Sequence, residues 1–509
     1  MDWEKTLWNL EIAVDETTAS GMAEAEINIP EDQEGALRFL CCQARVEDAS
    51  AQPSQGQVQV EGAVAFTVLY ETASGLASVE SRSGFTHTVA MSKAQAGQRV
   101  QLKVTALSTQ VRWINERQCR VECVLEMQIA LTERQERTLI TGVQGAGVQA
   151  STTPIEGSWV IGSSRQVVTL REDVELSPTL AAAENILWCQ GQVELTQVSC
   201  QAGQMDVAGQ LRLNVLYSAA APTWVEQTTL QLPISQQWDA SEIAQSQWLM
   251  GEGRVQECRI KLYDNIKGEK RVLAVEAQVL VTVQGYAAQQ TQALTDAYSV
   301  DEEITLETQV WKIPGAPQQA QSETPVTGEL KLPEGAALPD QVLEVLANPV
   351  VDSITVEQGR ATITGRLITS VIHLSGEERM LGCINGTAPF ETSVAAEGLQ
   401  AEDWLQVEVA GVTAGASTGP ADSLQIRDVL EITLIWRGIQ TQAVAVDGES
   451  EPWESELPSG LMLVVAQQDE DNWQMAKRCR IPLKELIQAN PQLAQREIEP
   501  GECLVVERS

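Results

Sequence analysis

Histidine is nearly absent from this chain, which has two histidines among 509 residues. Histidine is the commonest general base near neutral pH and a frequent metal ligand, so His87 and His373 are the first candidates for a catalytic or metal site. His87 lies in the segment FTHTV and His373 ends a strand-like segment. We interpret both as ordinary surface or edge residues, and we expect no catalytic residue and no enzymatic activity.

Closely spaced metal-ligand and phosphate-binding motifs are also missing. The ten cysteines are scattered, and only Cys119 and Cys123 have a metal-like spacing. On one strand these two positions lie about 13 Å apart, too far to share an ion. The glycine-rich segment GVQGAGVQAST has no lysine after it, so it is not a phosphate loop. We therefore expect no metal and no cofactor.

Positive charge is scarce, because 34 basic residues face 70 acidic ones and the net charge is −36. No basic stripe is visible, which argues against a nucleic-acid partner. The N-terminal segment MDWEKTLWNLEIAVDE lacks the basic start and apolar centre of a secretion signal. No apolar run approaches about 20 residues, so we expect no transmembrane segment. Without export, the thiols should be reduced, including Cys479 and Cys503 in the tail.

An interrupted strand pattern occurs three times. VQVEGAVAFTVLY, MDVAGQLRLNVLY and ATITGRLITSVIH each alternate apolar and polar residues around a glycine, at Gly62, Gly209 and Gly365. Alternation of this kind predicts strands with one buried face, and a strand glycine marks a bulge, a bend or a close backbone approach. We expect a mainly β protein in which these glycines occupy equivalent bends. Residues 35–42 (GALRFLCC) are the clearest early helical pattern.

The repeat extends beyond these strands. Each copy is preceded by a strand, a proline (Pro30, Pro178 and Pro333) and a short apolar segment, and is followed by another strand. The sequence thus predicts three tandem β-rich, sandwich-like domains and a small tail. The predicted bounds are 1–145, 158–308 and 320–446 for the repeats, 447–459 for an acidic linker and 460–509 for the tail. Residues 142–157 and 312–325 are the other expected linkers.

The tail has a different pattern. Leu461 to Val465 reads as a strand, Asp471 as the N-cap of a helix, and Pro482 as the start of a second helix that ends at Asn490. A last strand begins at Cys503. The expected order is β-α-α-β, and we expect this tail to move semi-independently of the rest.

The tail resembles the LysM module through DEDNWQMAKRC, KELIQANP and IEPGECLVV. In that module the loop before the first helix helps to bind N-acetylated sugars. Here Asp469, Glu470 and Asp471 occupy the loop, which favours a basic protein surface over a glycan, with salt-sensitive association. Trp473 fits either the core of the tail or a partner contact. With Asn490, these residues form the predicted partner-binding site.

The threefold repeat resembles the SPOCS domain, and three such units followed by one LysM module are typical of SipL-like spore-coat morphogenetic proteins of clostridia. The resemblance implies a scaffold in the mother-cell cytoplasm at the forespore surface. It also implies binding of a coat morphogenetic ATPase through the LysM end, together with other coat proteins. The alternative is a cell-wall protein that binds peptidoglycan, or N-acetylglucosamine, on a stalk of β domains.

Overall fold

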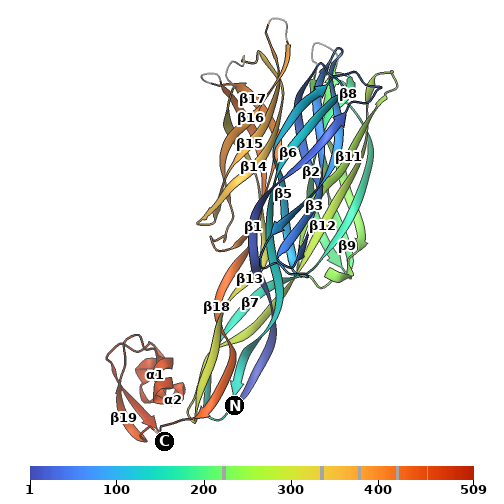
Figure 1. The fold of residues 1–509 in the computed structure, drawn as a ribbon. Helices are drawn as coiled ribbons and strands as arrows, with labels where there is room; N and C mark the ends of the chain where they lie inside the picture. The colour runs from blue at the N-terminus through green and yellow to red at the C-terminus, as the bar shows by residue number, and fades with distance from the viewer. Residues whose placement is uncertain (220–224, 333–337, 377–379, 420–422, 456, 509) are drawn as a thin grey trace.

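The computed structural model describes residues 1–219, 225–332, 338–376, 380–419, 423–455 and 457–508. The predicted Pro333 lies outside these residues. The described chain is mainly β, as the alternating patterns predict, and within it no helix is long and apolar enough to cross a membrane. Long sheets stand side by side at one end, narrow into a stalk, and a small helical tail lies at the far end of the stalk (Figure 1).

The first six strands form one unit of two antiparallel three-stranded sheets. One sheet has the order β1-β6-β5, and the other is the meander β2-β3-β4. The strands are β1 (Asp2–Asn28), β2 (Arg38–Ser54), β3 (Gln57–Thr72), β4 (Gly75–Ala90), β5 (Arg99–Asn115) and β6 (Gln118–Gln144).

Two further units have the same topology. In the second, β7 and β11 flank β12, and β8-β9-β10 is the meander; in the third, β13 and β17 flank β18, and β14-β15-β16 is the meander. The strands of the second unit are β7 (Val148–Glu175), β8 (Ala183–Gln201), β9 (Gln204–Ala219), β10 (Val225–Asp239), β11 (Trp248–Asp264) and β12 (Lys270–Ser299), with a 3-10 turn η1 (Ser241–Ile243). Those of the third are β13 (Glu302–Lys331), β14 (Gln341–Glu357), β15 (Arg360–Ser375), β16 (Met380–Ala395), β17 (Trp404–Thr418) and β18 (Ser423–Pro452).

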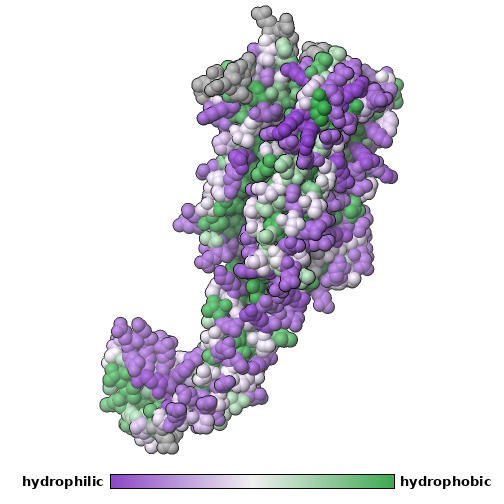
Figure 2. Space-filling view, viewed as in Figure 1, coloured by the Kyte–Doolittle hydropathy of each residue, from purple (hydrophilic) through white to green (hydrophobic). Residues whose placement is uncertain are grey.

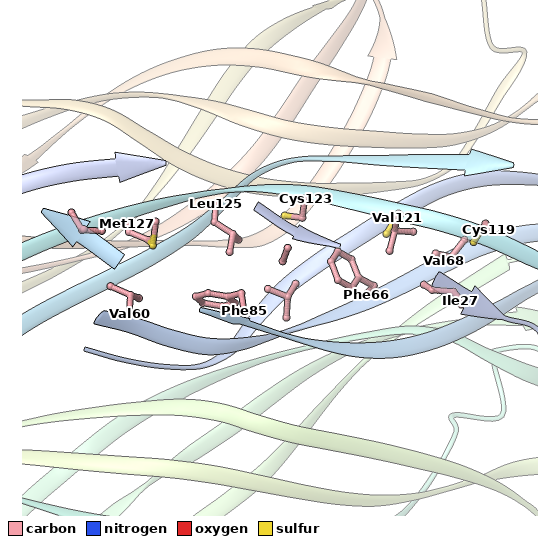
Figure 3. Packing of buried hydrophobic residues seen from close by; sticks show 14 of the residues in the cluster. Ile27, Val60, Phe66, Val68, Phe85, Cys119, Val121, Cys123, Leu125 and Met127 are labelled. Carbon is pink, nitrogen blue, oxygen red and sulfur yellow. The ribbon is translucent and has the colours of Figure 1, made fainter. Parts of the chain in front are cut away.

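Each unit buries a core between its two sheets, because every second residue of a strand points to the same face. In the first unit, Phe66 and neighbouring residues of the meander lie across from alternate residues of β6 between Cys119 and Met127 (Figure 3). Cys119 and Cys123 are fully buried members of this core, and burial raises the pKa of both thiols, to about 11 and about 12. Both are packing residues.

The repeated glycines sit on the central strand of each meander, opposite a bulge in its neighbour. Register shifts fall at residues 46–48 of β2, 195–197 of β8 and 351–353 of β14, beside Gly62, Gly209 and Gly365. A Cβ at any of the three would clash with a backbone carbonyl oxygen of that neighbour. The irregularity therefore belongs to the neighbouring strand, and the glycine provides the close approach that the bulge requires.

Several segments expected to be helix or linker are strands instead. Arg38 to Cys42, within the expected helix, open β2; residues 142–157 lie largely in β6 and β7, 312–325 lie in β13, and 447–452 lie in β18. These segments pair in long antiparallel ribbons made of the first and last strands of a unit, where small residues are needed: a Cβ at Gly157 would clash with Ile313 of the third unit. Glycine and other small residues, which are typical of flexible linkers, are present in these segments because three β-ribbons pack closely against one another.

The stalk is built from one two-stranded antiparallel ribbon of each unit, made of its first and last strands: β1-β6, β7-β12 and β13-β18. Their buried side chains occupy corresponding registers and meet in a shared stalk core: Trp8, Leu10, Leu139, Ile155, Ala293, Trp311, Ile313 and Val444. Above the stalk, the central strands β6, β12 and β18 pair with a strand on each side. This three-stranded pairing ends at equivalent positions in the three units, at Thr132, Tyr286 and Arg437. The three units thus surround one pseudo-threefold axis.

A cavity of about 1840 Å³ lies between the three units. It is lined by edge strands β2 and β5, β8 and β11, and β14 and β17, so each unit contributes one pair. An apolar cluster joins the three meanders beside this cavity. It contains Leu69, Leu216 and Ile372, which occupy the same position after the repeated glycine in each unit. Edge strands that would otherwise be open to pairing with other chains are therefore covered within the molecule.

The tail contains β19 (Gly460–Val465), α1 (Asn472–Cys479), α2 (Leu483–Ala489), the 3-10 turn η2 (Pro491–Ala494) and β20 (Cys503–Arg508). β19 and β20 form an antiparallel pair, and both helices pack on one of its faces. The order β-α-α-β agrees with the expected pattern at nearly every boundary, because caps and prolines define helix ends locally.

Candidate functional site in the C-terminal tail

The carboxylates before α1 have different surroundings. Asp471 is the N-cap: its side chain accepts a hydrogen bond from the amide of Gln474, 2.7 Å away, in a capping box. Glu470 forms an ion pair with Arg478 (2.6 Å) and its side chain is only 7 % exposed. The hydrogen bond from Arg478 lowers the pKa of Glu470. Only Asp469 and Asp471 are thus exposed to solvent, and the predicted acidic cluster is smaller than its sequence suggests.

Trp473 is directed at the second unit. Its indole nitrogen donates a hydrogen bond to Oδ2 of Asp296 (2.7 Å), and its ring packs edge-to-face on Tyr298 with centroids 4.9 Å apart. Tyr298 is 2 % exposed, and burial raises its pKa to about 12. In this structure Trp473 therefore makes an intramolecular contact; whether it also contacts a partner stays a prediction.

Further contacts join the tail to the end of β12. Lys477 Nζ lies 2.5 Å from Oδ1 of Asp296, and the Tyr298 hydroxyl donates to the carbonyl oxygen of Ile481 (3.0 Å). Trp453 lies on the segment that connects β18 to the tail, and the guanidinium of Arg480 in the tail stacks 3.4 Å from its ring centroid. The tail is docked on the stalk, which differs from the semi-independent motion we expected from its acidic linker.

Asn490 is a structural residue of the tail. It is 3 % exposed, donates to the carbonyl oxygens of Leu486 (2.9 Å) and Val505 (2.6 Å), and accepts from the amide of Val505 (2.9 Å). These bonds tie the end of α2 to β20. Its role in partner binding stays a prediction, although its buried amide already uses both of its donors within the tail.

The sequence interpretation missed an apolar surface on the tail. Leu461, Leu463 and Val465 of β19 are 74 %, 72 % and 56 % exposed, on the face of the β19-β20 pair opposite the helices. Val505 and Cys503 lie opposite them on β20. Figure 2 shows a hydrophobic patch on the tail at the side of β19. The signal was present: LMLVV has apolar residues at consecutive positions, so both faces of that strand are apolar.

His87 agrees with the sequence interpretation, since it is partly exposed on β4 at the edge of its meander, whereas His373 does not. His87 Nε2 contacts the backbone of Met22 on β1. His373 is buried rather than at the surface, packs over Gly382, and occupies the register of Tyr70 and Tyr217 in the other meanders. Burial lowers the pKa of His373. Among the described residues no group of three or more histidine, cysteine, aspartate or glutamate side chains is placed to hold a metal ion.

Comparison with protein families gives a match to the family described as SipL, SPOCS domain, at residues 36–114. This stretch of the chain is similar to the SPOCS domain of SipL. The matched residues begin just before β2 and end with β5, so they include the first meander and the first strand of the return to the stalk sheet. The match indicates a sporulation-related role. No curated protein and no solved structure gives a match.

Tail docking depends on Asp296, which is the common partner of Trp473 and Lys477. We expect Asp296→Ala to release the tail, because about 1–3 kcal/mol is typical for losing one shared charged acceptor. The check is the distance distribution between spin labels on α2 and on β7, which should be narrow in the parent protein and broad in the variant. Asp301→Ala, at an exposed carboxylate beside Gly147, is the control and should leave the distribution narrow. Equal distributions in all three proteins would contradict the docking role.

Proposed function

We propose that this protein is a non-enzymatic scaffold for spore-envelope assembly, and that its LysM-like tail binds a coat morphogenetic ATPase in the mother-cell cytoplasm at the forespore surface. The observation that carries the binding role is the exposed apolar face of β19-β20, with Leu461 and Leu463 more than 70 % exposed. Apolar patches of this kind on an otherwise strongly acidic chain are typical of protein-binding surfaces. The SPOCS match at residues 36–114 supports the sporulation context.

The body suits a scaffold because contacts between its units fix their relative positions. Gln192 of the second unit donates to Glu431 of the third (2.6 Å), and Lys103 of the first donates to the carbonyl oxygen of Val407 in the third (3.0 Å). Burial lowers the pKa of Lys103 and raises that of Glu431. A rigid three-unit body with a docked adaptor at one end presents separate surfaces at fixed spacing to other coat proteins.

A protein ligand is favoured over a glycan by the residues at the head of α1. Asp469 and Asp471 are exposed there and leave a negative surface, while the large exposed apolar side chains lie on the other face of the tail. Binding to a protein would combine apolar burial at the centre of the interface with steering of a basic surface by the exposed carboxylates. The alternative is a wall protein that binds N-acetylglucosamine oligomers. It predicts that the oligomers bind equally well when the apolar side chains of β19 are changed.

The test uses Leu463→Asp in the full chain. Leu463 is 72 % exposed, so the fold should be unaffected, whereas a charge at the centre of the apolar face should weaken binding of the purified coat morphogenetic ATPase by about tenfold or more. Isothermal titration measures the change. Ile266→Asp is the matched control, because Ile266 is a fully exposed apolar side chain on the turn between β11 and β12.

Chitin oligomers are included as competitors. The proposal expects that they do not displace the protein partner and do not bind the tail. It is wrong if the full chain binds chitin oligomers at micromolar strength and Leu463→Asp leaves binding of the ATPase unchanged.

A further inference from the structure

Two thiols meet in the wall of the central cavity. Cys189 of β8 and Cys258 of β11 belong to the two different sheets of the second unit, and their Sγ atoms are 3.7 Å apart. Both are free cysteines and both line the cavity between the three units. The sequence interpretation did not pair them, because they are 69 residues apart and belong to no recognisable motif.

Cys258 is also reached from a second cavity. This space, of about 430 Å³, lies between the first and second units and is lined by Arg45, Glu80, Cys258 and Arg259, among others. Arg45 and Glu80 line the central cavity as well. Cys258 therefore borders both of these cavities, whereas Cys189 borders only the central one of the two.

The two sulfurs have unequal character. The hydrogen bond between them lowers the pKa of Cys258 and raises that of Cys189; burial raises the pKa of both, and the guanidinium of Arg45 lowers both. The carboxylates of Glu80 and Glu257 face the same pair and oppose Arg45. Arg45 is held beside the pair by an ion pair with Glu47 (3.0 Å), whose carboxylate is also close to this space. Cys258 lines both cavities and Cys189 only the central one, so we assign Cys258 as the nucleophile and Cys189 as the second thiol.

We propose that Cys189 and Cys258 form a redox-active dithiol site, which a low-molecular-weight disulfide converts to a disulfide bond between the two sheets of the second unit. The Cys258 thiolate attacks one sulfur of the reagent, forming a mixed disulfide and releasing one reagent thiolate. Cys189 then loses its proton and attacks the Cys258 sulfur, forming the intramolecular bond and releasing the second thiolate. The two protein thiols are oxidised, the reagent is reduced to two thiols, and the protons go to those thiols.

The strands have room to adjust for this bond. The two sulfurs are 3.7 Å apart. A disulfide needs them about 2 Å apart, so they must approach each other by about 1.7 Å. Each strand carries an irregularity nearby, at residues 186–188 of β8 and 255–257 of β11. The resulting bond would join β8 to β11 across a long stretch of chain and oppose separation of the sheets.

A second pair provides a contrast within the same chain. Cys41 of β2 and Cys383 of β16 interact across the first and third units, and this interaction and burial raise the pKa of Cys383 well above its usual range. Neither residue lines either cavity. We expect this pair to form a disulfide more slowly than Cys189 and Cys258, because Cys41 is only 3 % exposed and lines neither cavity.

The experiment uses the full chain with the exposed Cys503 changed to serine, treated with oxidised glutathione and digested without reduction. Mass spectrometry should show a Cys189–Cys258 bond. The thermal midpoint of the oxidised protein should be higher than that of the reduced one. In Cys189→Ser the same treatment should stop at a glutathione adduct on Cys258, and in Cys258→Ser modification of Cys189 should be slower by about tenfold or more. Cys200→Ser, another cysteine of β8, should behave as the parent.

Disulfide formation is tested in the protein that keeps both Cys189 and Cys258, so the test does not depend on whether the single variants fold. Absence of the Cys189–Cys258 bond, when other cysteines of the same sample carry glutathione, overturns the proposal. Equal modification rates of Cys189 and Cys258 in the two single variants overturn the assignment of Cys258 as the nucleophile.

Discussion

Replacing Arg437 with methionine is expected to lower the free energy of unfolding by about 3 kcal/mol. Arg437 lies where the stalk meets the three units, and its side chain is 6 % exposed. It forms an ion pair with Glu11 of the first unit (2.6 Å). It also donates to the carbonyl oxygens of Ser158 in the second unit (2.6 Å) and of Gly315 in its own (3.3 Å). One guanidinium thus satisfies acceptors from all three units.

The expected loss comes from what the arginine leaves behind. Glu11 is only 14 % exposed, so without Arg437 its charge stays buried beside Arg99, which is 3.9 Å away and itself 41 % exposed. Two carbonyl oxygens also lose a donor. Since breaking a buried pair typically costs about 3–5 kcal/mol, and Arg99 compensates partly, the lower end of that range is expected.

The measurement is chemical denaturation of the full chain followed by circular dichroism. Arg171→Met is the control, because Arg171 pairs with Glu276 on the surface at 74 % and 46 % exposure, where a pair is worth about 1 kcal/mol or less. If both variants unfold at the same denaturant concentration, Arg437 does not hold the three units together.

The second large effect is expected at the repeated glycines. Gly365→Ala places a Cβ against the carbonyl oxygen of Val350 and the ring of Phe390, both closer than any normal contact. The carbonyl belongs to a bulged backbone and cannot rotate away as a side chain would. Overpacking of this kind typically costs about 1–3 kcal/mol, and we expect the upper half of that range.

Gly84→Ala is the matched control. Gly84 also lies within a meander, on β4, but an added Cβ would find only the carbonyl oxygen of Gly62 at 3.7 Å, an ordinary contact. Its effect should stay within about 0.5 kcal/mol. The same substitution at Gly62 or Gly209 should resemble Gly365→Ala, since a backbone carbonyl oxygen of the neighbouring strand blocks the added Cβ at all three positions. Equal stability of Gly84→Ala and Gly365→Ala would show that the bulge relaxes around the new methyl group.

Much of the secondary structure follows from local pattern. The alternation from Cys119 to Leu131 predicts a strand with one buried face, and each alternate residue is buried. Asp471 and Pro482 define the starts of two helices because a cap or a fixed φ acts within one turn. The same local rules failed at residues 142–157. Their glycine, serine and threonine content is typical of a linker, but it also suits a ribbon packed closely against two others.

The sequence by itself determined the β class, the threefold recurrence of the glycine strand and the β-α-α-β order of the tail, because each depends on spacing within a few residues. Only the tertiary structure decided the rest. It placed Trp473 on Asp296 and Tyr298, Arg437 between three units, and Cys189 beside Cys258. These neighbours are far apart in the chain, and their contacts depend on how whole sheets pack around a common axis. No local periodicity records that packing.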